Sequence, residues 1–140
     1  MKVLIAEDDH LTREIMGQLM VSLGLEPVPA KDGISAWMKY LEDPVPLVLI
    51  DRMIPGISGD ELCRRIRSLP DGGDSYIIMV TALSGRRHLA TGLQAGADDY
   101  ATKPLDTELF RARIRLAQKR LLNRRKRPTD SLSLLANIDS

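Results

Sequence analysis

Three short runs of aliphatic residues limit the fold of this chain more than any other feature of its sequence. Val3–Ala6, Leu47–Ile50 and Tyr76–Val80 are almost uninterrupted in apolar residues. Such runs are typical of strands that are buried on both faces, as in a parallel sheet covered by helices, because a half-exposed strand alternates apolar and polar residues. Pro27–Ala30 and Asp99–Ala101 are two further candidate strands.

The segments between these runs have the apolar spacing of amphipathic helices. Asp106 and Glu108 supply the negative charge that favours the start of the last helix. Strands that alternate with helices predict right-handed βαβ units, so we expect a doubly wound α/β domain with a five-stranded parallel sheet. The apolar repeats are Leu11, Ile15, Leu19 and Leu23; Leu62, Ile66 and Leu69; and Phe110, Ile114, Ala117 and Leu121.

The composition excludes several classes of protein. Hydrophobic residues make up 44% of the chain but aromatic residues only 4%, so the core must be aliphatic. The single Cys63 excludes a disulfide framework and a cysteine-rich zinc site, and is compatible with a reducing cytoplasm. We expect no membrane partner, since the apolar runs are too short to span a bilayer and the N-terminus does not resemble a signal peptide.

The charge changes sign along the chain. Residues 1–105 contain 11 Lys and Arg against 15 Asp and Glu, and the rest of the chain contains 9 against 4. The basic stretch Arg111–Arg127 has no interleaved aromatic residues and is more typical of a solvated helix face than of a nucleic-acid site. Pro128 is expected to break the helical pattern. We expect residues 1–125 to form one folded domain and residues 126–140 to be a linker or the start of a further domain.

Polar side chains follow the predicted strands where each strand ends. Glu7 and Asp8 follow the first strand, Asp51 the third, Thr81 the fourth and Lys103 the fifth. In a doubly wound sheet, ligands bind outside the carboxyl ends of the strands, at the point where the strand order reverses. We therefore expect these side chains to converge on one pocket.

The types of side chain in this pocket indicate its chemistry. Gathered carboxylates repel one another, and an all-oxygen ligand set suits Mg²⁺ or Mn²⁺ rather than zinc. A lysine can pair with a phosphoryl oxygen and a threonine hydroxyl can donate a hydrogen bond to it. The set is therefore consistent with an aspartyl-phosphate site, in which a carboxylate is the nucleophile and the cations offset the developing charge.

Four motifs, in this order and spacing, resemble those of the receiver domain of two-component response regulators. The resemblance covers about residues 2–122 and implies a flavodoxin-like three-layer sandwich. The intervals from Asp51 to Thr81 and from Thr81 to Lys103 also fit this family. The segments that carry the resemblance are Val3–Asp9, Asp51–Gly59, Val80–Ala82 and Asp98–Pro104.

The resemblance implies a role for each residue of the pocket. Asp51 would accept a phosphoryl group from a histidine kinase or a phosphotransfer protein. Asp8 would bind Mg²⁺ directly, Glu7 would act through water or at longer range, and Met53 would offer its backbone carbonyl. Lys103 would pair with the phosphoryl group, and its bond to the following proline is expected to be cis.

The resemblance also implies how phosphorylation would be transmitted. Thr81 would bond the phosphoryl oxygen and shift, and Tyr100 would then move inward. The surface of the fourth helix, fifth strand and fifth helix (the α4-β5-α5 surface) would change and could form a homodimer. In this interpretation the chain is a cytoplasmic, non-enzymatic phosphoacceptor switch. Met53 and Leu83 cannot position a water by hydrogen bonding, so we expect slow self-dephosphorylation.

The output of such a switch would lie outside the receiver. Ser133–Ser140 resembles the segment that leads into diguanylate cyclase (GGDEF-type) domains, so residues 126–140 could begin a missing output domain of that kind. A stand-alone or degenerate receiver that acts as a protein-interaction module is the alternative. A metal-dependent phosphohydrolase is disfavoured, because Met53 stands where that class would need a second carboxylate.

Other residues have simpler structural interpretations. Asp9 is better read as a helix cap than as a third metal ligand. Asp98 and Asp99 are better read as loop residues before the last strand than as a second metal pair. His10 and His88 are expected to be exposed histidines rather than phosphodonors, and Tyr100 could also be a simple packing residue.

Overall fold

The computed structural model describes residues 1–70 and 74–138, with side chains up to residue 124. Its five strands form one parallel sheet in the order β2-β1-β3-β4-β5, which confirms the predicted five-stranded parallel sheet. Every strand lies within one residue of its predicted bounds. The strands are β1 (Lys2–Ala6), β2 (Glu26–Ala30), β3 (Leu47–Ile50), β4 (Tyr76–Thr81) and β5 (Asp99–Thr102).

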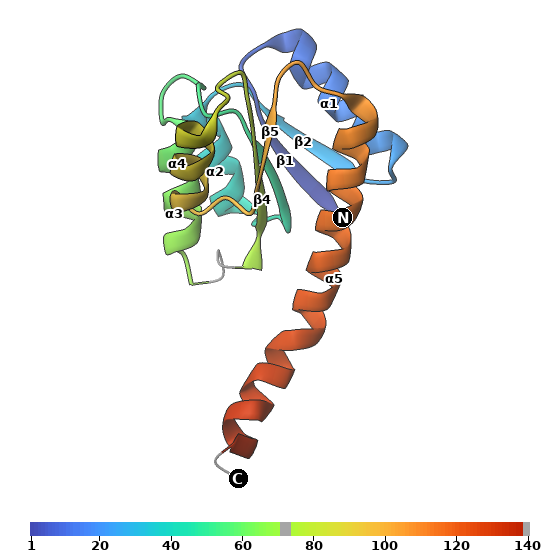
Figure 1. Cartoon of the computed structure of the whole chain (residues 1–140), viewed down its shortest axis with the longest axis vertical. Helices are drawn as coiled ribbons and strands as arrows, with labels where there is room; N and C mark the ends of the chain where they lie inside the picture. The colour runs from blue at the N-terminus through green and yellow to red at the C-terminus, as the bar shows by residue number, and fades with distance from the viewer. Residues whose placement is uncertain (71–73, 139–140) are drawn as a thin grey trace.

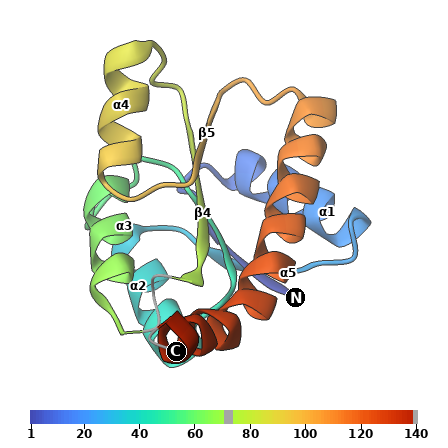
Figure 2. The same cartoon turned by 60° about the horizontal axis from the view of Figure 1, so that its bottom comes forward.

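Helices cover both faces of the sheet and make a three-layer sandwich. Figures 1 and 2 show α2, α3 and α4 on one face and α1 and α5 on the other. Alternate strand residues point to opposite faces: Leu4 and Val48 pack in one apolar layer, and Val3 and Leu49 in the other. This is why the central strands are apolar throughout. The helices are α1 (His10–Ser22), α2 (Gly33–Glu42), α3 (Gly59–Ser68), α4 (Arg86–Gln94) and α5 (Thr107–Ile138).

Short polar side chains fix where the helices begin. Asp9 caps α1 by accepting a hydrogen bond from Thr12 N at 2.8 Å. Asp32 caps α2 and Ser58 caps α3 in the same way. The interpretation of Asp9 as a cap is therefore confirmed.

The buried face of α1 differs from the one that its apolar repeat suggests. Leu11 and Ile15 are exposed, whereas Met16, Leu19 and Met20 are buried in the layer under α5. A spacing of four residues advances by about 40° at each step, so a repeat of fours drifts around the helix instead of staying on one face. The repeat predicted the helix correctly but not its buried side.

Helix α5 continues past Pro128, where the sequence pattern predicted a break, and ends at Ile138. A proline inside a helix costs about 3 kcal/mol, and the neighbouring Leu, Lys and Arg residues have high helix propensity. Figure 1 shows the last part of α5 extending beyond the sheet toward the C-terminus. In the described part of the chain, no helix is both long enough and apolar enough to cross a membrane.

Candidate functional site

The predicted site residues meet at the carboxyl edge of the sheet. Backbone hydrogen bonds extend the strand ladders past the strand ends and fix the residues that follow. Asp51 N donates to Ala6 O at 2.9 Å, and Lys103 N donates to Thr81 O at 2.8 Å. The site therefore lies where the strand order reverses beside β1, as the sequence predicted.

Three carboxylates form an acidic cluster at this edge. Glu7, Asp8 and Asp51 each place an oxygen within 4.8 Å of the others. The side chains of Glu7 and Asp51 are buried, with 1% and 7% of their surface exposed, and Asp8 is exposed. Carboxylate oxygens with one open side fit Mg²⁺, which keeps several water ligands. The residues present are thus suited to the predicted metal.

Lys103 is the cationic side chain that contacts two of these carboxylates. Its Nζ lies 2.6 Å from Glu7 Oε1 and 2.8 Å from Asp51 Oδ2. Burial lowers the pKa of Lys103, but hydrogen bonds to Asp51 and Glu7 outweigh it, so this pKa lies above its ordinary value. Burial raises the pKa of Glu7, and its hydrogen bond with Lys103 offsets only part of this effect.

A second cation lies close by but binds backbone atoms. Arg13 Nη1 donates to Glu7 O at 2.9 Å and to Asp8 O at 3.3 Å. It therefore fixes the turn after β1, whereas the carboxylate oxygens of Glu7 and Asp8 are left to other partners. Three carboxylates thus lie together beside one ammonium group, which contacts two of them, and this leaves a local excess of negative charge.

The loop after β3 is held by contacts within the chain itself. Asp51 Oδ1 accepts a hydrogen bond from Met53 N at 3.0 Å, and Gly56 has a φ of +84°. A Cβ on Gly59 would lie 2.5 Å from Arg52 Cα, so only glycine allows α3 to start this close to the loop. The backbone carbonyl of Met53 remains a predicted metal ligand, and its side chain is exposed.

Thr81 is the last residue of β4, and Tyr100 lies on the neighbouring strand β5. Thr81 is fully buried, and its Oγ1 accepts a hydrogen bond from Leu83 N at 3.3 Å. Tyr100 is also buried, and its hydroxyl donates to Leu83 O at 2.8 Å. The two side chains therefore contact the same β4–α4 loop. Ala82 is exposed, which leaves the site open at this point.

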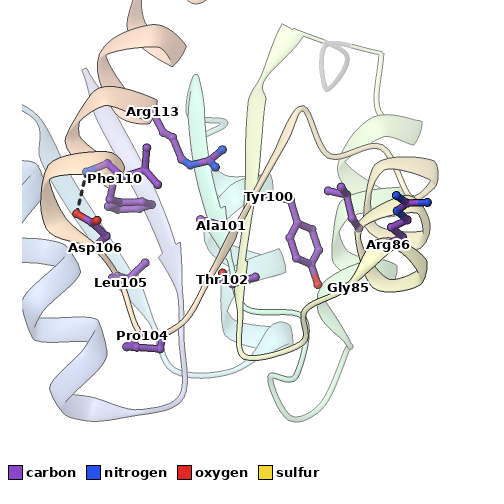
Figure 3. Close-up of a pocket in the computed structure, with 12 residues that line it drawn as sticks. Gly85, Arg86, Tyr100, Ala101, Thr102, Pro104, Leu105, Asp106, Phe110 and Arg113 are labelled. Atoms are coloured by element: carbon purple, nitrogen blue, oxygen red, sulfur yellow. Dashed lines mark hydrogen bonds between the residues drawn. The ribbon is translucent and has the colours of Figure 1, made fainter.

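The α4-β5-α5 surface contains a cavity of about 350 Å³ (Figure 3). Tyr100 forms one wall, and Leu89, Leu105 and Phe110 provide apolar contacts. Thr102 and Pro104, which flank Lys103 in the chain, both line this cavity, so the segment that carries Lys103 also forms part of this surface. The Lys103–Pro104 peptide bond is cis, which confirms the expectation drawn from the resemblance.

The remaining candidates have partners other than the acidic cluster. Asp98 pairs with Arg67 and Arg124 at 2.7 and 2.8 Å, and Asp99 pairs with Arg113. These two aspartates are ion-pair partners and do not form a second metal pair. His10 is exposed and contacts Arg13, and Cys63 is buried in α3, where burial raises its thiol pKa to about 11.

One residue of the site was not assigned a role from the sequence. Arg52 directly follows Asp51, and its guanidinium pairs with Asp60 in α3 and bonds the backbone of His88 in α4. It also reaches Tyr100 Oη at 3.4 Å. No local pattern in the sequence shows that this arginine is buried, because its partners come from three separate segments.

Comparisons with known proteins agree with this geometry. A family model described as "Response regulator receiver domain" matches residues 3–115. The transcriptional regulatory protein CseB of Streptomyces coelicolor is 38% identical over 118 residues, which is 84% of this chain and 49% of that protein. The cyclic di-GMP phosphodiesterase of Thermotoga maritima is 37% identical over 114 residues, covering 81% of this chain and 30% of that protein.

A solved structure shows the same architecture. The receiver domain of the Francisella response regulator 1452 matches with a TM-score of 0.79 and 28% identity, over 85% of this chain and 97% of that one. The chain spans half or less of the length of the two curated relatives described above. Those relatives carry different named functions, so similarity in this region does not select one output.

Proposed function

The chain belongs to the response regulator receiver domain family, and we propose that Asp51 is its phosphoacceptor. The observation that carries this proposal is the position of the Asp51 carboxylate. It is buried beside the carboxylates of Glu7 and Asp8, and it contacts the ammonium group of Lys103. Receiver domains take phosphoryl groups from histidine kinases or phosphotransfer proteins, and we propose such a donor here.

The side chains around Asp51 support phosphoryl transfer from a phosphohistidine. An Asp51 oxygen attacks phosphorus, and the oxygen–phosphorus bond forms as the phosphorus–nitrogen bond breaks. The leaving imidazole nitrogen keeps the electron pair and takes up a proton. Met53 N and Lys103 Nζ bind the two Asp51 oxygens and hold the carboxylate in one orientation before attack.

The charge that develops on the phosphoryl group needs offsetting cations and hydrogen-bond donors. Lys103 supplies one positive charge, and the Thr81 hydroxyl can turn from its present partner to donate to a phosphoryl oxygen. Glu7, Asp8, Asp51 and the Met53 carbonyl would hold Mg²⁺ or Mn²⁺. When bound, this ion would supply further positive charge at the phosphoryl oxygens.

We further propose that phosphorylation acts through the α4-β5-α5 surface. Thr81 and Tyr100 contact the same loop, so a shift of Thr81 toward the phosphoryl group changes the setting of Tyr100. Leu89 and Leu109 are exposed on this surface and could form a homodimer contact. The partner would be a second copy, another protein or an output domain joined through residues 126–140.

The nature of the output domain stays a prediction. The segment that resembles the approach to a diguanylate cyclase, residues 133–140, lies outside the part of the chain whose side chains the structure describes. Slow self-dephosphorylation is likewise a prediction. It is supported by the exposed Met53 side chain, which carries no group that could hold a water in line with the phosphoryl group.

The test is intact-mass spectrometry of the chain after incubation with acetyl phosphate or phosphoramidate, with Mg²⁺ or with EDTA. We expect a gain of one phosphoryl group that requires Mg²⁺. The gain should be absent in Asp51→Asn, strongly reduced in Asp8→Asn and retained in the control Asp98→Asn. If Asp51→Asn gains the group as the unaltered chain does, the assignment of the acceptor is wrong.

A further inference from the structure

The guanidinium group of Arg52 joins four separate parts of the molecule. Its Nε and Nη2 atoms bind both oxygens of Asp60 in α3, at 2.7 and 2.8 Å. Its Nη1 atom donates to the backbone oxygen of His88 in α4 at 2.8 Å and to Tyr100 Oη in β5 at 3.4 Å. Only 9% of the Arg52 side chain is exposed. A bidentate pair with this little solvent contact has a well-defined geometry.

The backbone of Arg52 is fixed as firmly as its side chain. Gly59 N donates to Arg52 O at 3.1 Å, and the absence of a Cβ on Gly59 allows the two backbones to meet. Arg52 is also bonded covalently to Asp51, the proposed acceptor. The position of its guanidinium is therefore set by the acceptor loop and by α3 together.

The ring of Tyr100 packs directly against Gly92 on α4, where a larger residue would leave no room for it. A Cβ on Gly92 would lie 2.9 Å from two carbons of the ring. At the other end of the ring, the hydroxyl donates to Leu83 O and accepts from Arg52. Figure 3 shows Tyr100 directed from β5 toward the start of α4. The buried position is thus held by polar contacts at the hydroxyl as well as by packing.

From this geometry we propose that Arg52 is a positioning residue that holds Tyr100 in its buried position before phosphorylation. This inference rests on the proposed function, because it concerns the resting state of the same switch. Arg52 ties the Tyr100 hydroxyl and the His88 carbonyl to the acceptor loop, so contacts within the chain itself link β5 and α4 to the residue that follows Asp51.

The proposal has a consequence that distinguishes it from a general stabilising role. If Arg52 holds Tyr100 inward, its removal should release the ring in the unmodified protein, and phosphorylation should then draw the ring back. The change in Tyr100 on phosphorylation should therefore be larger in an Arg52 variant than in the unaltered chain. A merely structural arginine would lower the free energy of unfolding and leave Tyr100 in place.

The test uses fluorine NMR of the full chain labelled with 3-fluorotyrosine, before and after phosphorylation at a level measured by intact mass. Tyr40 and Tyr76 are buried in other parts of the core and serve as internal controls. The variants are Arg52→Met and Arg52→Lys, with Asp60→Asn as a milder disruption of the same pair. Arg65→Met is the matched control, since Arg65 pairs with Glu61 in α3, is half-buried, and forms no hydrogen bond with Tyr100 in the described part of the chain.

We expect the unmodified Arg52→Met chain to shift the Tyr100 equilibrium about tenfold toward an exposed signal, within the usual range of coupling between two sites. Arg52→Lys should resemble it, because lysine lacks the planar fork with which Arg52 binds both oxygens of Asp60 while it also reaches His88 O and Tyr100 Oη. Arg65→Met should leave the signal unchanged. A Tyr100 signal that stays buried in both Arg52 variants, or moves only together with those of Tyr40 and Tyr76, would overturn the proposal. Absence of phosphorylation in the unaltered chain would instead count against the proposed function.

Discussion

The two ends of the sheet have opposite ratios of carboxylates to cationic side chains. At the carboxyl edge, the three carboxylates of Glu7, Asp8 and Asp51 lie together. The ammonium group of Lys103 contacts two of them, Glu7 and Asp51. At the amino edge the ratio is reversed. Asp98 alone accepts hydrogen bonds from two guanidinium groups and from a backbone amide.

The amino edge contains a structural ion-pair cluster, which we call the Asp98 cluster. Arg67 from α3 and Arg124 from α5 approach the same Asp98 carboxylate, and both also donate to Ser75 O. The charges there are satisfied within the fold, so the cluster stabilises the contact between two helices and the sheet. Its side chains have few polar atoms left for a ligand.

The carboxyl edge has only part of this internal compensation, because Lys103 pairs with two of its three carboxylates. Burial of Glu7 beside other carboxylates raises its pKa, which means that the folded state resists its ionisation. A site with this excess of negative charge binds a cation with a gain in stability. The Asp98 cluster therefore stabilises the fold, whereas the acidic cluster at the carboxyl edge is suited to bind a cation.

The largest effect should follow from breaking the amino-edge cluster. Asp98→Ala leaves two partly buried guanidinium groups without their carboxylate, so we expect the free energy of unfolding to fall by about 2–3 kcal/mol. Urea unfolding measures this change. Asp43→Ala, which removes an exposed carboxylate, is the control. If the free energy of unfolding falls no more than in the control, the Asp98 cluster does not stabilise the fold.

A smaller effect of the opposite sign should follow from filling the carboxyl edge. At a Mg²⁺ concentration ten times its Kd, we expect the free energy of unfolding to rise by about 1.4 kcal/mol. Urea unfolding with Mg²⁺ and with EDTA measures the rise. It should disappear in Asp8→Asn and persist in Asp98→Asn. Equal stabilisation of both variants would place the ion outside the acidic cluster.

The smallest effect should come from removing one carboxylate in the absence of metal. Asp51→Asn relieves repulsion from Glu7 and Asp8 but gives up the ion pair with Lys103, and these terms largely cancel. We expect a net rise of about 1 kcal/mol in the free energy of unfolding in EDTA. If Asp51→Asn lowers the free energy of unfolding as much as Asp98→Ala does, the carboxylates at the carboxyl edge stabilise the fold as those at the amino edge do.

The sequence predicted most of the sheet and the convergence of the site, because both depend on local signals. Uninterrupted apolar runs mark strands buried on two faces, and in a parallel sheet the residues after these strands must lie at one edge. Glu7, Asp8, Asp51, Thr81 and Lys103 were placed correctly for this reason.

The sequence could not predict contacts that depend on the packing of distant segments. Arg52 is buried by Asp60, His88 and Tyr100, which come from three other elements. Asp98 was correctly separated from the metal site, but its role as the partner of two arginines depends on how α3 and α5 pack. The exposed position of Leu11 likewise depends on the rotation of α1 against the sheet.

The most direct test of the central claim is to locate the phosphoryl group chemically. The chain is incubated with acetyl phosphate and Mg²⁺, the acyl phosphate is reduced with borohydride to homoserine, and the peptides are sequenced by mass spectrometry. We predict homoserine at position 51 alone, and none when EDTA replaces Mg²⁺. Homoserine at position 8, 9 or 98, or equal reduction at position 51 in EDTA, would contradict the account.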